Sequence, residues 1–351
     1  MSLEVLPVEL LQAILKQLCP RDLAALSSIS RPIYPVAMRE LYTSITLNKR
    51  KQSRLLAKSL KHRPAKASFV KYLVVGSSIT YVFYYHAVAN GLLKLRTDSD
   101  AVKALPDIVK HLDQLKHFEI TADEISSKRL NTVIHALKAE QLTHLTLLTD
   151  LQPIGDLVDF IVGRHPNLQE LHLSPHALCG DKIPTLALTK LEEFVGPSWC
   201  FSRQTVEMPL FQVSIAWSAE APEAGTEDII RSLATSCKDS LKVLCCSKPG
   251  PCEELVDAIT TSFPDLRGLE ISSSVIINSP NTVKRLATSL AKMQELIALS
   301  FNPSLVLSDQ RRGGIDLLQI VDNAKAIRSL SCCGVSWSKV DNRWVHVEKN
   351  C

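Results

Sequence analysis

One short apolar pattern recurs along most of the chain and constrains its fold more than any other feature. An apolar residue is followed three positions later by a second one, and two positions after that by a third. From Leu115 to Ile327, the first positions of consecutive copies lie 27, 26, 23, 19, 31, 25, 30 and 31 residues apart. A pattern of this period indicates a stack of repeated units rather than one closed domain. The copies are Tyr42/Ile45/Leu47, Val70/Leu73/Val75, Leu115/Phe118/Ile120, Leu142/Leu145/Leu147, Leu168/Leu171/Leu173, Leu191/Phe194/Gly196, Leu210/Val213/Ile215, Leu241/Leu244/Cys246, Leu266/Leu269/Ile271, Leu296/Leu299/Phe301 and Ile327/Leu330/Cys332.

Helix-like stretches separate these copies, so each repeat is expected to be one strand followed by one helix. The apolar pattern and its spacing are those of a leucine-rich repeat. Only 5% of the residues are aromatic, which favours a leucine-based stack over a sandwich. We therefore expect an α/β solenoid over residues 48–351, with parallel strands on its concave face and helices on its convex face. The expected helices cover residues 51–62, 101–112, 126–137, 226–237, 253–262, 282–292 and 315–323.

A separate helical module is expected over residues 1–47. Pro7 suits the start of a first helix, and Cys19-Pro20 ends it. Asp22 can cap a second helix, and apolar residues from Ile33 to Leu41 outline a third. A unit of about 40 residues is marginal alone, so its remaining apolar face needs cover from the rest of the chain or from another protein. The first helix has a wide apolar stripe made of Leu10, Leu11, Ile14, Leu15 and Leu18.

The N-terminal module contains a characteristic set of residues: Leu6-Pro7, Glu9-Leu10-Leu11, Ile14-Leu15, Leu18, Asp22-Leu23 and Leu26. Position by position, this set resembles the F-box motif. Residues 41–47 resemble the segment that follows the motif in F-box proteins numerous in fungi, and the repeats resemble those of F-box/leucine-rich-repeat proteins. One departure is Ser30-Arg31, where the motif usually has Cys-Arg, and Pro32 and Pro35 follow. A short or broken third helix is therefore expected.

The resemblance implies a function in protein ubiquitination. An F-box binds a Skp-type adaptor and, through it, a cullin, so the chain would be the substrate-recognition subunit of a ubiquitin ligase and not itself an enzyme. Two alternatives stay open: a helical cap on the repeats, and a leucine-rich-repeat scaffold that serves no ligase. The resemblance implies that the adaptor-binding residues are Leu6, Pro7, Leu10, Leu11, Ile14, Leu15, Leu18, Leu23 and Leu26.

The polar residues between the apolar positions are expected to line the concave face. Side chains alternate along a strand and neighbouring strands lie about 4.8 Å apart, so equivalent positions form columns. Three interpretations are open: a solvated polar surface, a surface that binds a basic or polar protein target, and a metal site at His117, His144 and Glu170. A flat sheet splays its ligands, so we expect no metal. The candidate target-binding residues here are His117, Glu119, His144, Glu170, His172 and Glu193.

Two further features are candidate recognition elements. Trp199 and Trp217 follow expected strands, where each is either an interface anchor or a cover for the core. Residues 76–100 interrupt the repeat period, and this insert contains Tyr81 and Tyr84 among its aromatic residues. The insert is either a loop that packs on the solenoid or a recognition loop.

Other function classes find no support in the sequence. It contains no phosphate-binding loop, no GxGxxG, no HExxH and no GxSxG motif. The ten cysteines include no Cys-x-x-Cys pair, which indicates a reduced, intracellular protein in the cytoplasm and/or nucleus, without cofactor. The net charge of +4 and the absence of a long apolar run argue against nucleic acid and membrane as partners. The basic residues of 49–66 are interpreted as the solvated face of an amphipathic helix.

Overall fold

The computed structural model divides the chain into two compact units. The first unit contains residues up to 149, and the second contains the described residues from 153 on. No helix in these described parts is both long and apolar enough to span a membrane. The structure describes residues 6–76, 101–122, 125–149, 153–175, 177–179, 183–217, 225–273, 280–303, 321, 326–332, 335–341 and 343–347.

The first unit begins with three helices that share one small core. Pro7 precedes α1 (Val8–Leu15), and Pro20 opens α2 (Pro20–Ile29). The expectation of a short or broken third helix was wrong, because α3 (Tyr34–Thr43) has 10 residues. Pro35 lies in its first turn, where a missing N–H removes no intrahelical hydrogen bond. The core residues are Leu11, Leu15, Leu23, Ile33 and Ala37.

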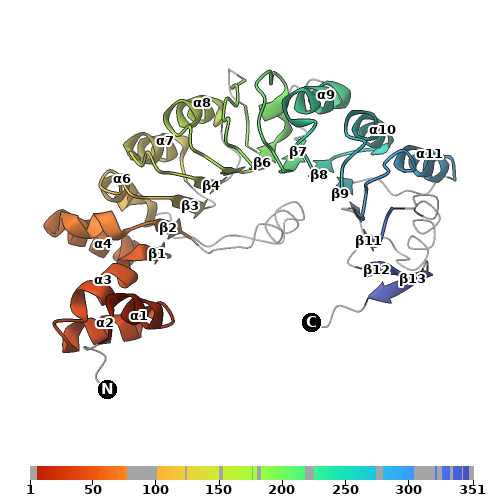
Figure 1. The fold of residues 1–351 in the computed structure, drawn as a ribbon. Coiled ribbons are helices and arrows are strands. Elements are labelled where there is room, and N and C mark those ends of the chain that lie inside the picture. The colour runs from red at the N-terminus through yellow and green to blue at the C-terminus, as the bar shows by residue number, and fades with distance from the viewer. Residues whose placement is uncertain are drawn as a thin grey trace. The chain divides into compact units, whose positions relative to one another are not determined.

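Strands and helices then alternate through the rest of the first unit. Its four strands pair in parallel where their register is described, and α4, α6 and α7 lie on one side of them (Figure 1). The strands are β1 (Ser44–Leu47), β2 (Tyr72–Val75), β3 (His117–Ala122) and β4 (His144–Thr149). The helices are α4 (Arg50–His62), η2 (Pro64–Phe69), η3 (Ala101–Ala104), α6 (Leu105–Val109) and α7 (Ser127–Ala136).

The second unit continues the same alternation and ends differently. Strands β5 to β11 pair in parallel, whereas β12 and β13 add as antiparallel neighbours. The strands are β5 (Glu170–Leu173), β6 (Glu193–Pro197), β7 (Gln212–Ala216), β8 (Val243–Lys248), β9 (Gly268–Ser273), β10 (Ala298–Pro303), β11 (Ser329–Cys332), β12 (Val335–Val340) and β13 (Arg343–Val347). The helices are α8 (Gly155–Arg164), η4 (Ser198–Phe201), α9 (Thr226–Cys237), α10 (Glu253–Ser262) and α11 (Pro280–Leu290).

The recurrent apolar pattern forms the core of both units. From Val70 onward every residue of the pattern is buried, whereas Tyr42 and Ile45 of the first copy are partly exposed. Equivalent residues of neighbouring strands are paired, as Leu73 is with Phe118. The predicted mixed α/β stack with parallel strands is therefore confirmed. The split between residues 1–47 and 48–351 stays a prediction.

Some helices differ from the expectation. Residues 101–112 form a 3-10 turn followed by a five-residue α-helix, because Pro106 cannot sit inside a longer one. Helix α8 and the antiparallel pair of β12 and β13 have no counterpart among the expected elements. Most of 315–323, and the insert after Gly76, lie outside the described residues.

The weakest copy of the pattern, in β6, is completed by an aromatic ring. Gly196 occupies the third apolar position, and a Cβ there would lie 2.8 Å from the Phe194 ring. Phe194 is fully buried and meets the Phe201 ring edge-on at 5.0 Å between centroids. The Phe194 ring therefore fills the space that a branched side chain fills in the other copies.

We expect Phe194→Ala to lower the free energy of unfolding by about 3–5 kcal/mol, because it removes a fully buried ring and leaves a cavity. Phe211→Ala is the matched control, since Phe211 is exposed and its loss should cost less than about 0.5 kcal/mol. Chemical denaturation followed by circular dichroism measures both. Equal losses for the two variants would contradict this account of the core.

Candidate functional sites: the N-terminal helices and the strand face

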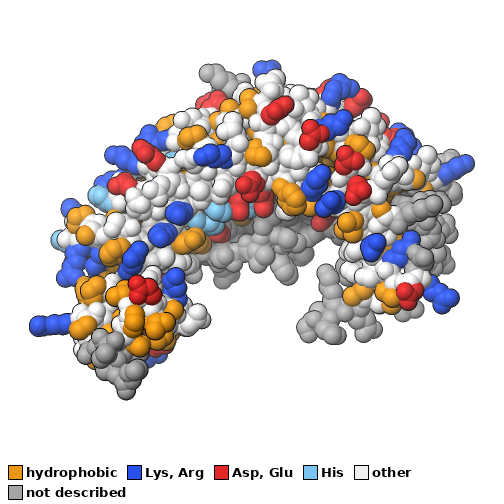
Figure 2. Space-filling model, viewed as in Figure 1, with side chains coloured by type: hydrophobic (Ala, Val, Ile, Leu, Met, Phe, Trp, Pro, Cys, Tyr) orange, Lys and Arg blue, Asp and Glu red, His pale blue; other side chains and the backbone are white. Residues whose placement is uncertain are grey.

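The N-terminal helices combine a closed core with an exposed apolar ridge. Leu11 and Leu15 of α1 point into the core, whereas Leu10 and Ile14, one turn apart, are 55% and 41% exposed. Val8 is also exposed, as is Pro7. Figure 2 shows hydrophobic side chains gathered over these helices. Exposed apolar residues gathered on a small helical module make this ridge a candidate interaction surface.

The predicted adaptor-binding set divides between these two roles. Leu11, Leu15 and Leu23 are 5% exposed or less, so they hold the helices together and offer no side-chain surface to a partner. This corrects their assignment as contact residues, which took the whole apolar stripe for a binding face. Leu18 and Leu26 are partly buried and pack against the core. The members of the set with exposed or partly exposed side chains are Leu6, Pro7, Leu10, Ile14, Leu18 and Leu26.

Polar contacts fix these helices to each other and to the first repeat. The Gln12 side-chain amide donates a hydrogen bond to the Glu40 carboxylate at 2.6 Å and so joins α1 to α3. The Tyr42 hydroxyl lies 2.9 Å from the Ser59 hydroxyl of α4. Lys66 donates to the Tyr42 hydroxyl at 3.2 Å, and its ammonium lies 4.6 Å from the centre of the Tyr42 ring. Helix α3 also runs into β1 without a linker residue.

We call the side of each sheet that faces away from the helices the strand face. In the first unit, Tyr72, His117 and His144 are register-paired on this face of β2, β3 and β4. The ring centroids lie 6.1 Å apart for Tyr72 and His117, and 5.5 Å apart for His117 and His144. Glu119 accepts a hydrogen bond from Thr121 at 3.2 Å and lies 3.7 Å from His117 Nε2. The predicted column of aromatic and imidazole rings is therefore present.

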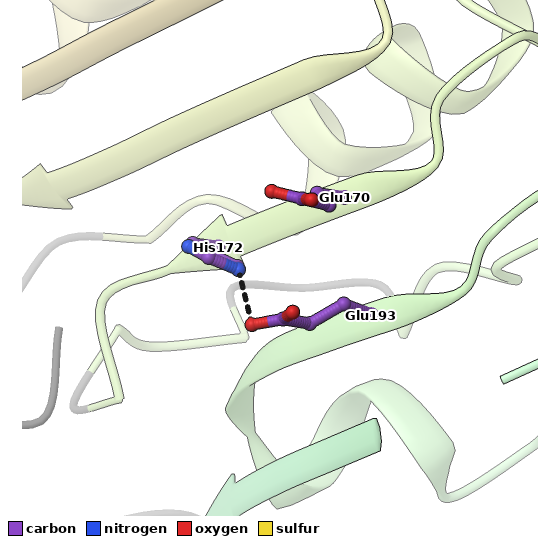
Figure 3. Close-up of side chains that lie close together, drawn as sticks. All are labelled: Glu170, His172 and Glu193. Carbon is purple, nitrogen blue, oxygen red and sulfur yellow. Dashed lines mark hydrogen bonds and ion pairs between the residues drawn. The ribbon is translucent and has the colours of Figure 1, made fainter. Parts of the chain in front are cut away.

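The second unit brings three ionisable side chains together on its strand face. Glu170 and His172 are two residues apart on β5 and point to the same side, and Glu193 on β6 pairs in register with Glu170 (Figure 3). His172 Nε2 lies 3.1 Å from Glu193 Oε1. One ligand atom from each of the three residues lies within 4.8 Å of the others. The side chains of His172 and Glu193 are 13% and 29% exposed, so this cluster is partly shielded from water.

The strand face remains polar on the neighbouring strands. Ser214 of β7 pairs in register with Cys245 of β8, which pairs with Glu270 of β9. Burial raises the pKa of the Cys245 thiol to about 12, and the carboxylates of Glu270 and Glu193 add to this increase. A hydrogen bond with Ser214 lowers the pKa, but by less than these effects together. Cys245 is therefore a neutral thiol at neutral pH.

The two tryptophans that were candidate recognition residues are core residues. Trp199 and Trp217 are 3% and 5% exposed, and the Trp199 indole N–H donates to the Ala177 carbonyl at 2.8 Å. Of the two interpretations given for these residues, the burial supports a cover for the core and argues against an interface anchor.

The residues that could hold a metal in the structure differ from those considered in the sequence. His117 and His144 belong to the first unit, whereas Glu170 belongs to the second. The cluster that forms among the described residues is Glu170, His172 and Glu193. All three were candidate target-binding residues. The i, i+2 spacing on β5, combined with the alignment of the repeats, is the sequence signal for their proximity.

The buried cysteines behave as small apolar residues, and Cys246 and Cys332 do so at the third apolar position of their copies of the pattern. Burial raises the pKa of Cys200 and Cys246 well above the usual value and that of Cys237 to about 12. In α4, Leu56 and Leu60 are buried while Lys51 and Arg54 are exposed, as the amphipathic pattern indicates.

Comparisons with known proteins identify the N-terminal domain. Residues 3–48 match the F-box-like family. No curated protein matches the chain. A solved structure titled "Crystal structure of TLR13-ssRNA13 complex" is similar, with 14% identity over 84% of this chain and 44% of that chain, and a TM-score of 0.36. The chain thus spans less than half the length of that one. The fold and the family match together define an F-box-like domain followed by a stack of strand–helix units.

We expect Cys245 to react with iodoacetamide at neutral pH at least about 100-fold more slowly than the exposed Cys19, because the thiolate is the reactive form and its pKa of about 12 leaves almost none. Peptide mass spectrometry at timed intervals measures both rates. Protein unfolded in guanidinium is the control, in which the two cysteines should react alike. Equal rates in the folded protein would contradict the environment described for Cys245.

Proposed function

We propose that this chain is the substrate-recognition subunit of a Skp–cullin–F-box type ubiquitin ligase. Two independent observations support the proposal. The first is the match of residues 3–48 to the F-box-like family. The second is the exposed ridge of Leu10 and Ile14 on α1, which leaves apolar surface uncovered by the chain's own core.

The ridge can supply a large part of the binding free energy for a Skp-type adaptor. Full burial of a leucine or isoleucine side chain contributes about 1.5–3 kcal/mol. Pro7 and the partly exposed Leu6 extend this surface at the start of α1. The buried Leu11, Leu15 and Leu23 keep the ridge rigid, which lowers the entropy lost when an adaptor binds.

The proposed mechanism is tethering. The adaptor links the chain to a cullin, which holds the ubiquitin-conjugating enzyme. A target bound to the repeats is thereby held near that enzyme at an effective concentration in the ~mM range for flexible links. This mechanism needs no acid, base or nucleophile from the chain, and its place is the cytoplasm or nucleus, where such ligases act.

The strand face is the surface proposed for the target. Among the described residues it presents Tyr72 and paired histidines in the first unit, and two glutamates beside His172 in the second. Paired polar rows on rigid strands suit recognition of a polar or basic protein segment. The residues proposed to contact the target are His117, Glu119, His144, Glu170, His172 and Glu193.

A second candidate function is a scaffold that binds partners without serving a ligase. The polar strand face supports it as well as it supports a receptor, because neither role needs catalysis. Co-purification distinguishes the two: a receptor brings down both adaptor and cullin, whereas a scaffold brings down no cullin.

We expect the double variant Leu10→Asp/Ile14→Asp to lose adaptor binding by at least about 100-fold, because each substitution places a charge in an apolar contact. Both side chains are exposed, so the helices should keep their melting temperature. Calorimetry with purified adaptor and thermal melting measure the two effects. Leu6→Ala/Pro7→Ala tests the start of the same ridge.

Leu55→Asp is the matched control, since Leu55 of α4 is 58% exposed and outside the F-box-like domain. It should bind the adaptor as the unmodified chain does. Unchanged binding in the Leu10→Asp/Ile14→Asp variant would refute the assignment of this ridge.

We further expect Glu170→Lys/Glu193→Lys to reduce target capture by at least about 10-fold while adaptor binding persists, because the charge of the strand face is reversed. Quantitative mass spectrometry of proteins that co-purify with the unmodified chain and with the variant measures this. Glu227→Lys, on the exposed surface of α9, is the control. Identical profiles for all three chains would exclude this part of the strand face from target binding.

A further inference from the structure

The cluster of Glu170, His172 and Glu193 has the geometry of a partial metal coordination shell. Two ligands come from one strand at positions i and i+2, and the third comes from the adjacent strand in register (Figure 3). All three side chains therefore project from one side of a rigid parallel sheet. Their nearest ligand atoms lie within 4.8 Å of one another.

The spacing is close to what a small divalent ion requires. Zinc binds imidazole nitrogen and carboxylate oxygen at about 2.0–2.2 Å, which places tetrahedral ligands about 3.3 Å apart. His172 Nε2 and Glu193 Oε1 already lie 3.1 Å apart. The backbone of Glu170 is held in β5. Rotation about its side-chain torsions can bring its carboxylate closer to His172 and Glu193.

Electrostatics favour a cation at this place. Glu170 and Glu193 pair in register, and like charges directly opposite each other on adjacent strands are destabilising. Partial burial of His172 and Glu193 reduces the screening of that repulsion by water. A divalent ion between the carboxylates offsets both negative charges.

The ligand types indicate which ion fits. One imidazole with two carboxylates suits Zn²⁺ and its transition-metal neighbours, while Ca²⁺ requires six to eight oxygen ligands. Cys245 lies on β8, two strands from β6, and is not one of the three clustered residues.

We propose that Glu170, His172 and Glu193 bind one Zn²⁺-class divalent ion on the strand face of the second unit. Three protein ligands leave one position of a tetrahedral ion to water or to a donor from another molecule. The ion would then lie on the surface proposed for target binding. Metal binding itself does not depend on the ligase function and is tested without adaptor or target.

The test uses the full chain, freed of metal by a chelator and titrated with Zn²⁺ in competition with a chromophoric chelator. The unmodified chain is expected to bind one Zn²⁺ that His172→Ala and Glu193→Gln each weaken by at least about 10-fold. Co²⁺ titration gives a second readout, because its visible absorption reports bound nitrogen and oxygen ligands. Circular dichroism confirms that each variant is folded, and the isosteric Glu193→Gln guards against a loss of binding through misfolding.

His144→Ala and Cys245→Ser are the matched controls. His144 occupies the strand face of the first unit, and Cys245 lies near the cluster without belonging to it. Both variants should bind Zn²⁺ as the unmodified chain does. The proposal is overturned if the unmodified chain has no Zn²⁺ site tighter than about 1 mM, or if folded His172→Ala and Glu193→Gln bind as tightly as the controls. Loss of binding only in Cys245→Ser would also overturn it, because the ion would then be held by sulfur.

Discussion

Each repeat of one strand and one helix has an apolar edge that it cannot cover alone. The stacking of repeats buries this edge and stabilises each of the two compact units. Leu73 and Phe118 show the arrangement: they are fully buried and paired in register on adjacent strands. Because side chains alternate along a strand, the same stacking turns the intervening residues outward. Tyr72 and His117 are thus aligned by the burial of their neighbours, and the polar rows of the strand face are a direct consequence of the core.

Helix α1 shows how one short segment serves folding and binding together. Adjacent leucines differ by about 100° around a helix, so Leu11 enters the core while Leu10 faces outward. Leu15 and Ile14 repeat this division one turn later. A substitution on the inner side therefore affects the domain's stability, and one on the outer side affects what the domain binds. The two effects are separable because the core of the three helices is already closed.

Local periodicity predicted strands β1 to β11, because alternation is a property of each strand alone, and alignment of the repeats predicted which positions pair. It did not predict β12 and β13, which lack the pattern and pair as an antiparallel hairpin. Nor did it decide between an exposed and a buried Trp199, because burial there depends on tertiary packing. The core role of Leu11 and Leu15 was also missed, because the width of an apolar stripe does not tell which part of it the neighbouring helices cover. His172 and Glu193 approach each other through strand pairing, which periodicity shows only after the repeats are aligned.

The direct passage from α3 into β1, secured by Tyr42, Ser59 and Lys66, leaves no hinge between the F-box-like helices and the first strand. In a receptor of the kind proposed, the distance from the docking helices to a bound target would then change in fixed increments. Within the first unit, each strand added or removed would shift a contact by about 4.8 Å along the sheet. Lengthening by repeats would thus alter which lysines of a bound target come within range, without any change in the docking helices.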